Sequence, residues 1–474
     1  MPSVSDNSAS ALRMQFEDVE EALDVRLVLR AKELQLFKLV DRSIDGKYWR
    51  LNYQTKGNSY GASRFRDGKH PGYDPSGLAE DGFAPFEIEE MKFYARFYEQ
   101  SLDFTGQMKH AVKSRKGGYR NLVDFRFDDT AKFLEWNVAT RLALGSLGTR
   151  ALILDPDAVP ATPKKYVAVR YAGYTPVATP PVWEAGVGYL RAGQRVDAVG
   201  GPARTGALRA GATDRGRHII DVGIDKGSAG AGVIIELNTP HTSWAAGDWL
   251  CVYNERQAAA ITGDYEGKVA SMLGVLDVFD DGAGYSPYYG GVDRTASGNA
   301  SLQCSVFHNS GTVRRLTPDL VNFVVEQVNH LSDGEFDMLY SRMGVQREFA
   351  KFLTKTAATS TATDNPMRYN QPGAKQKIGF NSYDVFPLGM DGKLMFVPSA
   401  NAPLHSAFLM KRGEGIFLRD GPPSFMNLDG LTIRKVSGEN SYTADYGMTA
   451  GGFVHKAPWK LARIDDLIGD HMTE

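Results

Sequence analysis

The sequence has little cysteine and no long apolar run, and each shortage excludes a class of protein. Two cysteines in 474 residues, Cys251 and Cys304, allow one disulfide at most. Both lie in apolar segments typical of β-strands, where a buried free thiol is more common than a disulfide. No run of about 18 apolar residues occurs, so no segment matches a membrane-spanning helix. Because no basic or apolar segment precedes Leu12, we expect a protein made in the cytosol.

Net charge is also almost absent. Lys and Arg number 54 against 56 Asp and Glu, a formal charge of -2, so the chain as a whole does not attract a polyanion strongly. Sequence-specific nucleic-acid binding is therefore not expected. The content of 42% hydrophobic and 23% charged residues is typical of a folded chain with two or three sub-cores. The 50 glycines, spread through the chain, favour many tight turns and a strand-rich mixed fold.

The first 90 residues divide into a helical segment and a long polar segment. Apolar residues recur at three- and four-residue steps from Leu12 to Val40, which predicts one or two amphipathic helices. Such a helix packs either on its own domain or across a neighbouring subunit, and the sequence leaves both open. From Asp41 to Pro85 Gly, Pro, Ser and charged residues dominate. Six aromatic residues argue against plain disorder, so we predict a long hairpin that docks elsewhere: Tyr48, Trp49, Tyr53, Tyr60, Phe65 and Tyr73.

A strand and a long helix follow. Residues 91–97 alternate with period two, which predicts a strand. The basic stretch Lys109 to Arg126 is a solvated face, a subunit contact or a DNA contact, in that order of preference. Asp128-Asp129-Thr130 is a helix start, and Gly145 or Gly148 is the expected end of that helix.

Three further patterns mark the second half of the chain. Short strands alternate with Gly-rich turns between Lys164 and Tyr253, which indicates a small β-module inserted in a larger fold. Its expected strands include residues 166–171, 218–224 and 233–237. Thr317-Pro318-Asp319 combines an N-cap, a proline at the first helical position and an acid, and so predicts the start of a helix whose apolar residues run from Leu320 to Leu331. Asp391-Gly392 between apolar runs predicts a hairpin.

Catalytic and metal-binding patterns find no support. There is no His-Glu-x-x-His and no Cys-x-x-Cys, and the nine histidines are scattered. Gly57-Asn58-Ser59-Tyr60-Gly61 matches the motif of a nucleophile elbow, but no strand is evident before it and no helix after it. The residues from Gly263 to Val269 lack the glycine spacing of a phosphate-binding loop. Asp277, Asp280, Asp281 and Gly282 miss the calcium-loop spacing, so a solvated turn is favoured. We predict no enzyme, no cofactor and no metal.

Taken in order, these segments resemble the major capsid proteins of tailed bacteriophages, the Hong Kong 97-like fold family also found in encapsulins and the herpesvirus capsid floor. The likeness covers the arm, loop and long helix. It also covers Tyr-Tyr-Gly-Gly-Val-Asp-Arg-Thr from Tyr288, the capped helix at Thr317 and Asp-Gly-Glu-Phe-Asp-Met-Leu-Tyr-Ser from Asp333. The resemblance implies an α+β fold with an N-terminal arm, an extended loop, a peripheral domain with a long spine helix, an axial domain and a β-rich insertion.

Mapped onto the chain, the resemblance implies six regions. They are an N-terminal helical arm at 1–41, an extended loop at 42–90, a peripheral domain with the spine helix at 91–163, the β-rich insertion at 164–253, an axial domain at 254–390 and C-terminal strands returning to the peripheral domain at 391–474. The axial domain would hold the Gly290 to Arg294 turn and the helices from Thr317 and Val345. The closing strands would be Leu394 to Val397 and Gly452 to Ile464.

The function implied is self-assembly into an icosahedral head shell, as hexamers and pentamers, around double-stranded DNA held by weak non-specific contacts. Family members that carry their own scaffold have a long charged helical segment at the N-terminus, whereas here the apolar helical pattern begins by about residue 12. The resemblance therefore implies a separate scaffolding protein, together with a portal and a possible decoration protein. The place implied is the virion capsid, assembled in the host cytoplasm. We expect subunit contacts from twelve residues: Tyr60, Arg64, Phe65, Arg66, Lys69, Glu87, Glu89, Glu90, Arg115, Lys116, Asp293 and Arg294.

Two alternatives remain open. A β-rich enzyme or carbohydrate-binding protein could use the β-module and the aromatic residues Trp183, Trp244 and Trp249. An encapsulin-like cargo shell would share the fold and differ in its contents. Lysines of the extended loop could take part in crosslinking, but no asparagine partner is evident and none is predicted.

Overall fold

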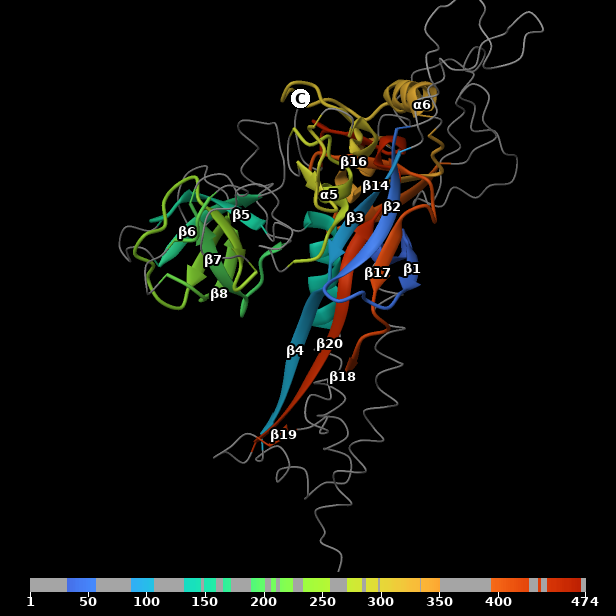
Figure 1. Cartoon of the computed structure of the whole chain (residues 1–474). Coiled ribbons are helices and arrows are strands. Elements are labelled where there is room, and N and C mark those ends of the chain that lie inside the picture. The colour runs from blue at the N-terminus through green and yellow to red at the C-terminus, as the bar shows by residue number, and fades with distance from the viewer. Residues whose placement is uncertain are drawn as a thin grey trace, which may run out of the picture.

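The computed structural model describes most of the chain apart from the N-terminus and several internal segments. The described residues are 32–56, 87–105, 132–145, 149–158, 165–171, 189–200, 206–209, 214–224, 233–255, 271–283, 287–296, 299–332, 334–349, 394–425, 434–435 and 441–469. They form a mixed α and β structure with two main sheets, a separate barrel and few helices (Figure 1). No helix among them is long and apolar enough to cross a membrane.

The first sheet is built around one long strand near the C-terminus, β20. The central path is β1, β17, β20 and β18, and β20 also pairs with β4 and β19. β1 is parallel to β17, whereas the strands that pair with β20 are antiparallel to it. The six strands are β1 (Lys38–Asp41), β4 (Arg96–Thr105), β17 (Ile416–Arg419), β18 (Ser424–Phe425), β19 (Arg434–Lys435) and β20 (Ser441–Val454).

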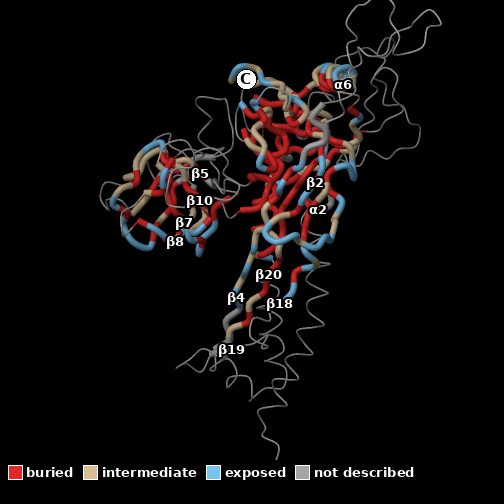
Figure 2. Tube along the Cα trace, viewed as in Figure 1, coloured by how far each residue is buried: buried red, intermediate tan, exposed pale blue. Residues whose placement is uncertain are grey.

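β4 and β20 run together out of the body as a long antiparallel ribbon, and the short strands β18 and β19 pair with the other edge of β20 (Figure 1). Ten residue pairs join them, from Arg96 opposite Ala450 to Thr105 opposite Ser441. At about 3.4 Å per residue the paired length is roughly 30 Å. Ala444, Tyr446, Met448 and Ala450 of β20 are buried, so the face of the ribbon that they share belongs to the core, while Asp445 and Thr449 on the other face are half-buried. Figure 2 shows that β20 is buried where it crosses the body.

The second sheet combines strands from the middle and the end of the chain. Its order is β13, β21, β16, β14 and β15. The five strands are β13 (Ser305–Phe307), β14 (Met338–Arg342), β15 (Met395–Ser399), β16 (Ala407–Met410) and β21 (Ala462–Ile464). Helix α6 (Pro318–Ser332) packs on this sheet through Val321, Val324, Val325 and Val328, which share one apolar cluster with Leu339, Leu409 and Ile464.

The N-terminus of α6 forms as the sequence predicts. The Thr317 hydroxyl accepts a hydrogen bond from the Leu320 amide at 3.2 Å, which satisfies one of the amides that a helix start leaves unpaired. Pro318 needs no donor at the first helical position. A second helix at 343–349 follows β14 where the helix from Val345 was expected.

The inserted module is a closed six-stranded barrel. The strands follow the order β10, β5, β6, β9, β8 and β7, and β10 closes the ring because it pairs with both β5 and β7. Its strands are β5 (Thr149–Asp155), β6 (Tyr166–Tyr171), β7 (Arg195–Val199), β8 (Arg217–Ile224), β9 (Val233–Leu237) and β10 (Trp249–Val252). The expected strands at 166–171, 218–224 and 233–237 are therefore confirmed. The module begins at Thr149, earlier than the expected 164, because β5 supplies one wall.

Smaller elements complete the body. β2 (Tyr48–Lys56) and β3 (Glu87–Tyr94) form an antiparallel pair, and β11 (Tyr288–Tyr289) and β12 (Val292–Asp293) form a tight one. The short helices are α2 (Lys32–Gln35), α5 (Val275–Val278), η4 (Ala300–Leu302) and η5 (Pro458–Lys460). A helix described over 132–144 lies at the centre of the body and ends at Gly145, whose φ of +83° closes the helix as predicted.

Three expectations about the fold need correction. Residues 38–41, expected as helix, form β1, because they add to the edge of β17. The predicted hairpin that docks elsewhere is part of the subunit's own core where it begins, because Trp49, Leu51 and Tyr53 of β2 are buried in the largest apolar cluster. The C-terminal strands do not all return to one domain, since β15, β16 and β21 complete the sheet that holds β13 and β14. The hairpin at Asp391-Gly392 lies outside the described residues.

Candidate assembly surfaces

The outer edge of the ribbon is the longest strand edge that the described sheets leave open. Among the described strands β4 pairs with β20 alone, so its opposite edge extends over Arg96–Thr105 without a strand partner. A long open edge presents a row of backbone N–H and C=O groups and is a template for another chain. This edge can therefore receive a strand or loop from a second molecule.

The outward face of the ribbon carries one large apolar residue among polar ones. Phe97 is 73% exposed, and it stands opposite Thr449 of β20. Farther out, Ser101 Oγ donates a hydrogen bond to Asp445 Oδ1 at 2.7 Å across the two strands. The face is thus held in register by side chains of the subunit itself, while the Phe97 ring is left to solvent.

Helix α6 presents a second exposed apolar surface. Phe323 is 51% exposed and Leu331 is 73% exposed, although both lie in a helix whose other face is packed on the sheet. Leu331 was expected in the apolar face of this helix and is instead on the surface. The Phe323 ring has an edge contact with Phe307 of β13 at 6.1 Å between centroids, which fixes its direction. Exposed apolar residues on a rigid helix are suited to contact with another protein surface.

Three contacts fasten the barrel to the body. Tyr189 precedes β7 and is 0% exposed, and its hydroxyl lies 2.9 Å from the Ala402 carbonyl and 3.0 Å from that of Asn401. Arg191 stands over the Trp136 ring at 4.2 Å from its centroid. Arg141, on the same helix as Trp136, forms a buried ion pair with Glu255, which follows β10. The body therefore holds the barrel at two places: the segment before β7 and the chain that leaves β10.

The hydroxyl of Tyr189 gives a first prediction. Tyr189→Phe is expected to lower the free energy of unfolding by about 1–2 kcal/mol, because two buried carbonyl oxygens lose their donor. Urea denaturation of the purified subunit measures this. Tyr166→Phe is the control: Tyr166 lies on the barrel wall, its hydroxyl has no hydrogen bond among the described contacts, and a change within about 0.5 kcal/mol is expected. Equal losses in both variants would contradict the clamp.

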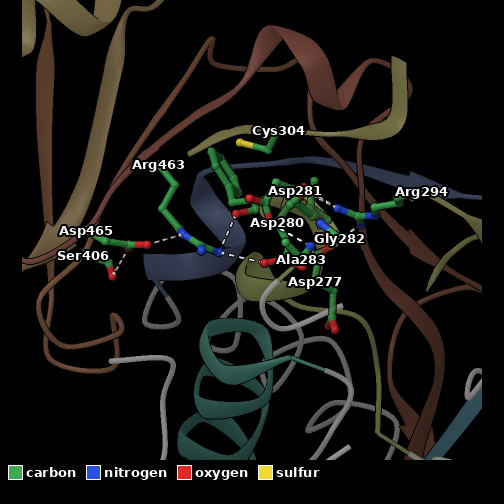
Figure 3. A network of polar contacts seen from close by, with 12 residues as sticks. Asp277, Asp280, Asp281, Gly282, Ala283, Arg294, Cys304, Ser406, Arg463 and Asp465 are labelled. Carbon is green, nitrogen blue, oxygen red and sulfur yellow. Dashed lines mark hydrogen bonds and ion pairs between the residues drawn. The ribbon is translucent and has the colours of Figure 1, made fainter. Parts of the chain in front are cut away.

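A buried charged network connects β21 with the residues that follow α5 (Figure 3). Arg463 of β21 is 1% exposed, and its guanidinium lies 3.2 Å from Asp280 Oδ1 and 3.0 Å from Asp465 Oδ2. It also donates to the Phe279 carbonyl at 2.7 Å, and Ser406, just before β16, donates to Asp465 at 2.7 Å. Burial by itself lowers the pKa of Arg463, but the two carboxylates reverse this and raise it, so the guanidinium stays charged.

A second buried arginine holds the end of α5. Arg294 donates to the Asp280 carbonyl at 2.5 Å and to the carbonyl of Asp277, and it stands over the Tyr289 ring at 4.5 Å. These carbonyls lie at the C-terminal end of α5, where a helix favours positive charge. Arg294 is 0% exposed, so it stabilises the subunit itself. This corrects the expectation that it contacts a neighbouring subunit.

Comparison with known proteins gives a loose likeness. No protein-family model and no curated protein sequence matches the chain. The solved structures that are similar over most of the chain include capsids, each with a TM-score below 0.5. The capsid of cyanophage A-1(L) has a TM-score of 0.47 and 8% identity, covering 92% of this chain and 91% of its own. A native GTA particle capsid has a TM-score of 0.41 and 7% identity, covering 93% and 91%.

A further similar structure is that of Mycobacterium phage Adephagia, with a TM-score of 0.38 and 10% identity over 94% of this chain and 91% of that one. An encapsulin from Synechococcus elongatus covers 36% of this chain and 56% of its own, with a TM-score of 0.23 and 13% identity. Likeness this loose identifies neither a function nor a partner.

Most of the expected subunit contacts lie outside the described residues. This holds for seven of them: Tyr60, Arg64, Phe65, Arg66, Lys69, Arg115 and Lys116. Glu87 and Glu89 lie in β3, with only their backbone described, and Glu90 is exposed and 3.4 Å from Arg50 of β2. Asp293 is half-buried and accepts hydrogen bonds from the Thr295 amide and hydroxyl at 2.9 Å and 2.7 Å. Of this set, Glu90 and Asp293 have described side chains that reach the surface.

The residues weighed for other functions have structural roles. Cys251 and Cys304 are free and buried, as expected. Asp277, Asp280 and Asp281 each accept a backbone amide in a nearby turn, from Gly274, Gly282 and Ala283 respectively. Within the described ranges no group of His, Cys, Asp or Glu is arranged to hold a metal. Trp244 is buried and stacked on His241 at 5.1 Å, which removes it as an exposed platform for a sugar.

Three of the features described above could not be predicted from local sequence patterns. The residues next to Arg463 in the sequence do not indicate that its side chain is buried and not solvated. The barrel clamp joins residues more than a hundred positions apart, such as Arg141 and Glu255. Phe97 fits the alternation of a strand that is buried on one face, so the sequence did not indicate that its side chain is exposed. Its exposure follows from the position of β4 in the ribbon.

Proposed function

We propose that this chain is the major capsid protein of a tailed bacteriophage, which assembles with copies of itself into the icosahedral shell around the genome. In this proposal the subunit does its work through contact surfaces and carries out no catalysis. The sequence resemblance described above supports the proposal through the order of its segments. The geometry of the ribbon supports it independently.

The observation that carries the proposal is the ribbon of β4 and β20. It extends about ten residue pairs from the body, with one long open edge and Phe97 exposed at 73%. A solitary molecule gains little burial from such a projection, because only one face of it meets the core. A molecule surrounded by copies of itself covers the open edge and the exposed apolar face. The projecting strands are therefore suited to a repeated contact.

Self-assembly also accounts for the exposed residues on α6. If several copies meet around an axis, the same helix of each copy lies near its neighbours, and one apolar surface is covered many times. Each such contact can be small, because a closed ring adds them together. We propose that α6 lies towards the centre of hexamers and pentamers, and that the residues 57–86 between β2 and β3 reach a neighbouring subunit.

Finer parts of the proposal rest on the chain's composition and on the family resemblance. A separate scaffolding protein, a portal and a decoration protein would complete the particle. Double-stranded DNA would meet the inner surface weakly, because a formal charge of -2 gives little net attraction. The protein would be assembled in the host cytoplasm and end in the virion capsid. The expected contact residues other than Arg294 remain part of this proposal.

Electron microscopy of the purified protein tests the function directly. The expected result is closed particles or ring-shaped capsomers, formed by the chain alone or when it is co-expressed with a scaffolding protein. Light scattering should then give masses far above that of one 52.0 kDa chain. A species that stays monomeric at every concentration, with or without scaffolding protein, would contradict the proposal.

The exposed face of α6 gives a second prediction. Changing Phe323 and Leu331 together to Glu is expected to lower the yield of particles roughly tenfold or more, since each covered apolar residue contributes about 1 kcal/mol or more to an interface. Analytical sedimentation and negative-stain microscopy measure the yield. The free energy of unfolding should change by less than about 1 kcal/mol, because both side chains are largely exposed.

The matched control is Glu326→Lys, on the exposed face of the same helix. It changes the net charge by the same magnitude as the double variant, with the opposite sign, and removes no apolar surface. Its particle yield should stay within about twofold of the parent. If the double variant assembles as well as this control, α6 is not an assembly surface.

A further inference from the structure

A buried glutamate fastens the first described residues to the five-stranded sheet. Glu33 of α2 is 1% exposed. Its Oε1 accepts hydrogen bonds from the Tyr340 hydroxyl of β14 at 3.3 Å and from the Ser399 hydroxyl of β15. Ser399 in turn accepts the Asn401 amide at 3.0 Å. The carboxyl group is thus inserted between two strands of a sheet to which α2 does not otherwise belong.

The residues that follow Glu33 dock as one continuous segment. Leu34, Leu36 and Phe37 are buried, and Phe37 stacks on Phe453 of β20 at 3.8 Å. The Lys38 amide donates to the Gly415 carbonyl at 2.9 Å, and the Arg42 amide donates to that of Arg419 at 3.0 Å. β1 lies between these two bonds, at the edge of the first sheet. Release of this segment would open an apolar groove and the edge of β17.

Among the side chains that the structure describes, no cation compensates for a charge on Glu33. Among the described residues Glu33 forms no ion pair, and its neighbours are hydroxyl and amide groups: Tyr340 on β14, Ser399 on β15 and Asn401 in the following turn. Tyr189 lies behind Tyr340, with its own hydroxyl bonded to backbone carbonyls. Arg342 lies on the same face of β14 as Tyr340 but makes no ion pair with Glu33. A charged carboxylate here would lose its hydration without gaining a counter-charge.

The protonation of Glu33 is therefore coupled to docking. Burial raises the pKa of Glu33 above its ordinary 4.5, although hydrogen bonds from Ser399, Asn401 and Tyr340 act in the opposite direction. A group whose pKa is raised in the docked state gives its full stabilisation below its ordinary pKa. That stabilisation is lost as the pH rises through the docked pKa. High pH should thus weaken the docking of this segment.

We propose that residues 33–42 form a pH-sensitive latch, which stays docked while Glu33 is a neutral acid and opens more readily once Glu33 has released its proton to solvent. The docked segment covers the apolar groove, and the open segment exposes it. This device belongs to the single subunit and does not depend on the proposed shell. It can therefore be tested whether or not particles form.

Amide hydrogen exchange on the unassembled full-length subunit tests the latch. The reporters are the amides of Lys38 and Arg42, followed from pH 4.5 to pH 8 and corrected for intrinsic exchange. Their protection factors should fall by up to about tenfold per pH unit above 4.5 and level off above the docked pKa of Glu33. Protection that does not change with pH would overturn the proposal.

Two variants and a control separate the latch from general effects of pH. Glu33→Gln keeps the acceptor oxygen and cannot ionise, so the reporters should show no slope. Tyr340→Phe removes a donor that favours the charged form, so the fall should extend to higher pH. Glu335→Gln, at an exposed carboxylate whose side chain is 60% accessible, should leave the parental slope unchanged. A slope retained in Glu33→Gln, or abolished in Glu335→Gln, would refute the assignment.

Discussion

Arg463→Ala is expected to lower the free energy of unfolding by about 3–5 kcal/mol, because the change leaves Asp280 and Asp465 as buried carboxylates without their cation. Both carboxylates are 0% exposed, so water cannot replace the guanidinium. The Phe279 carbonyl also loses its donor. Urea denaturation followed by circular dichroism measures the loss.

The informative control removes the whole charged group. A triple variant with Arg463→Met, Asp280→Asn and Asp465→Asn should lose clearly less than Arg463→Ala, since a buried ion pair contributes little net stability while an unpaired buried charge costs much. The asparagine oxygens can still accept from Gly282 and Ser406. An Arg463→Ala loss below about 1 kcal/mol, or a triple variant as unstable as the single one, would contradict the role of the network.

Gly452→Ala should destabilise the subunit by about 3 kcal/mol or more. Gly452 has φ +99°, where a side chain is strained, and a Cβ there would stand 2.2 Å from the Leu273 carbonyl oxygen and 2.5 Å from the Leu273 nitrogen. Those atoms hold the residues before α5 against β20, through the bonds of Leu273 N to Gly451 O and of Phe453 N to Leu273 O. The backbone must move to admit a methyl group.

Gly421→Ala separates the two causes of that loss. Gly421 also has a positive φ, +78°, but nothing lies within 4 Å of a Cβ built there. Its change should cost only the backbone strain, about 1–2 kcal/mol. Thermal and urea denaturation of both variants give the comparison. If the two losses are equal, the close approach of Leu273 to β20 does not constrain the fold.

Elements that are specified by neighbouring residues could be predicted from the sequence. Helix α6 was predicted from its first residues, because a Thr cap, a Pro and an acid act within one turn. The end of the long helix at Gly145 was predicted for the same local reason. Strands β6, β8 and β9 were found from alternation between turns. By contrast, residues 38–41 fit a helical spacing and still became β1, because β17, far away in the sequence, offers an edge.

The candidate surfaces were predicted less well. Among the expected contact residues, Arg294 is buried under α5 and Glu90 is exposed beside Arg50. The exposed Phe97 and Leu331 were not among them, since apolar residues in regular patterns normally belong to the core. Burial is set by what packs on the other side of an element, and one-dimensional spacing does not contain that. The same holds for Glu33, which reads as one acid in a helical pattern.

The sequence by itself determined the features with short-range causes: an α+β composition rich in turns, the capped start of α6, the end of the long helix at one of two glycines, and the strands β6, β8 and β9 of the inserted module. The tertiary structure alone decided the division of the C-terminal strands between two sheets, the open edge of β4, and the burial of Glu33, Arg294 and Arg463. The reason is range. Caps and turns are fixed by neighbours a few bonds away, whereas sheet partners and the solvation of a charge depend on residues brought together only when the chain folds.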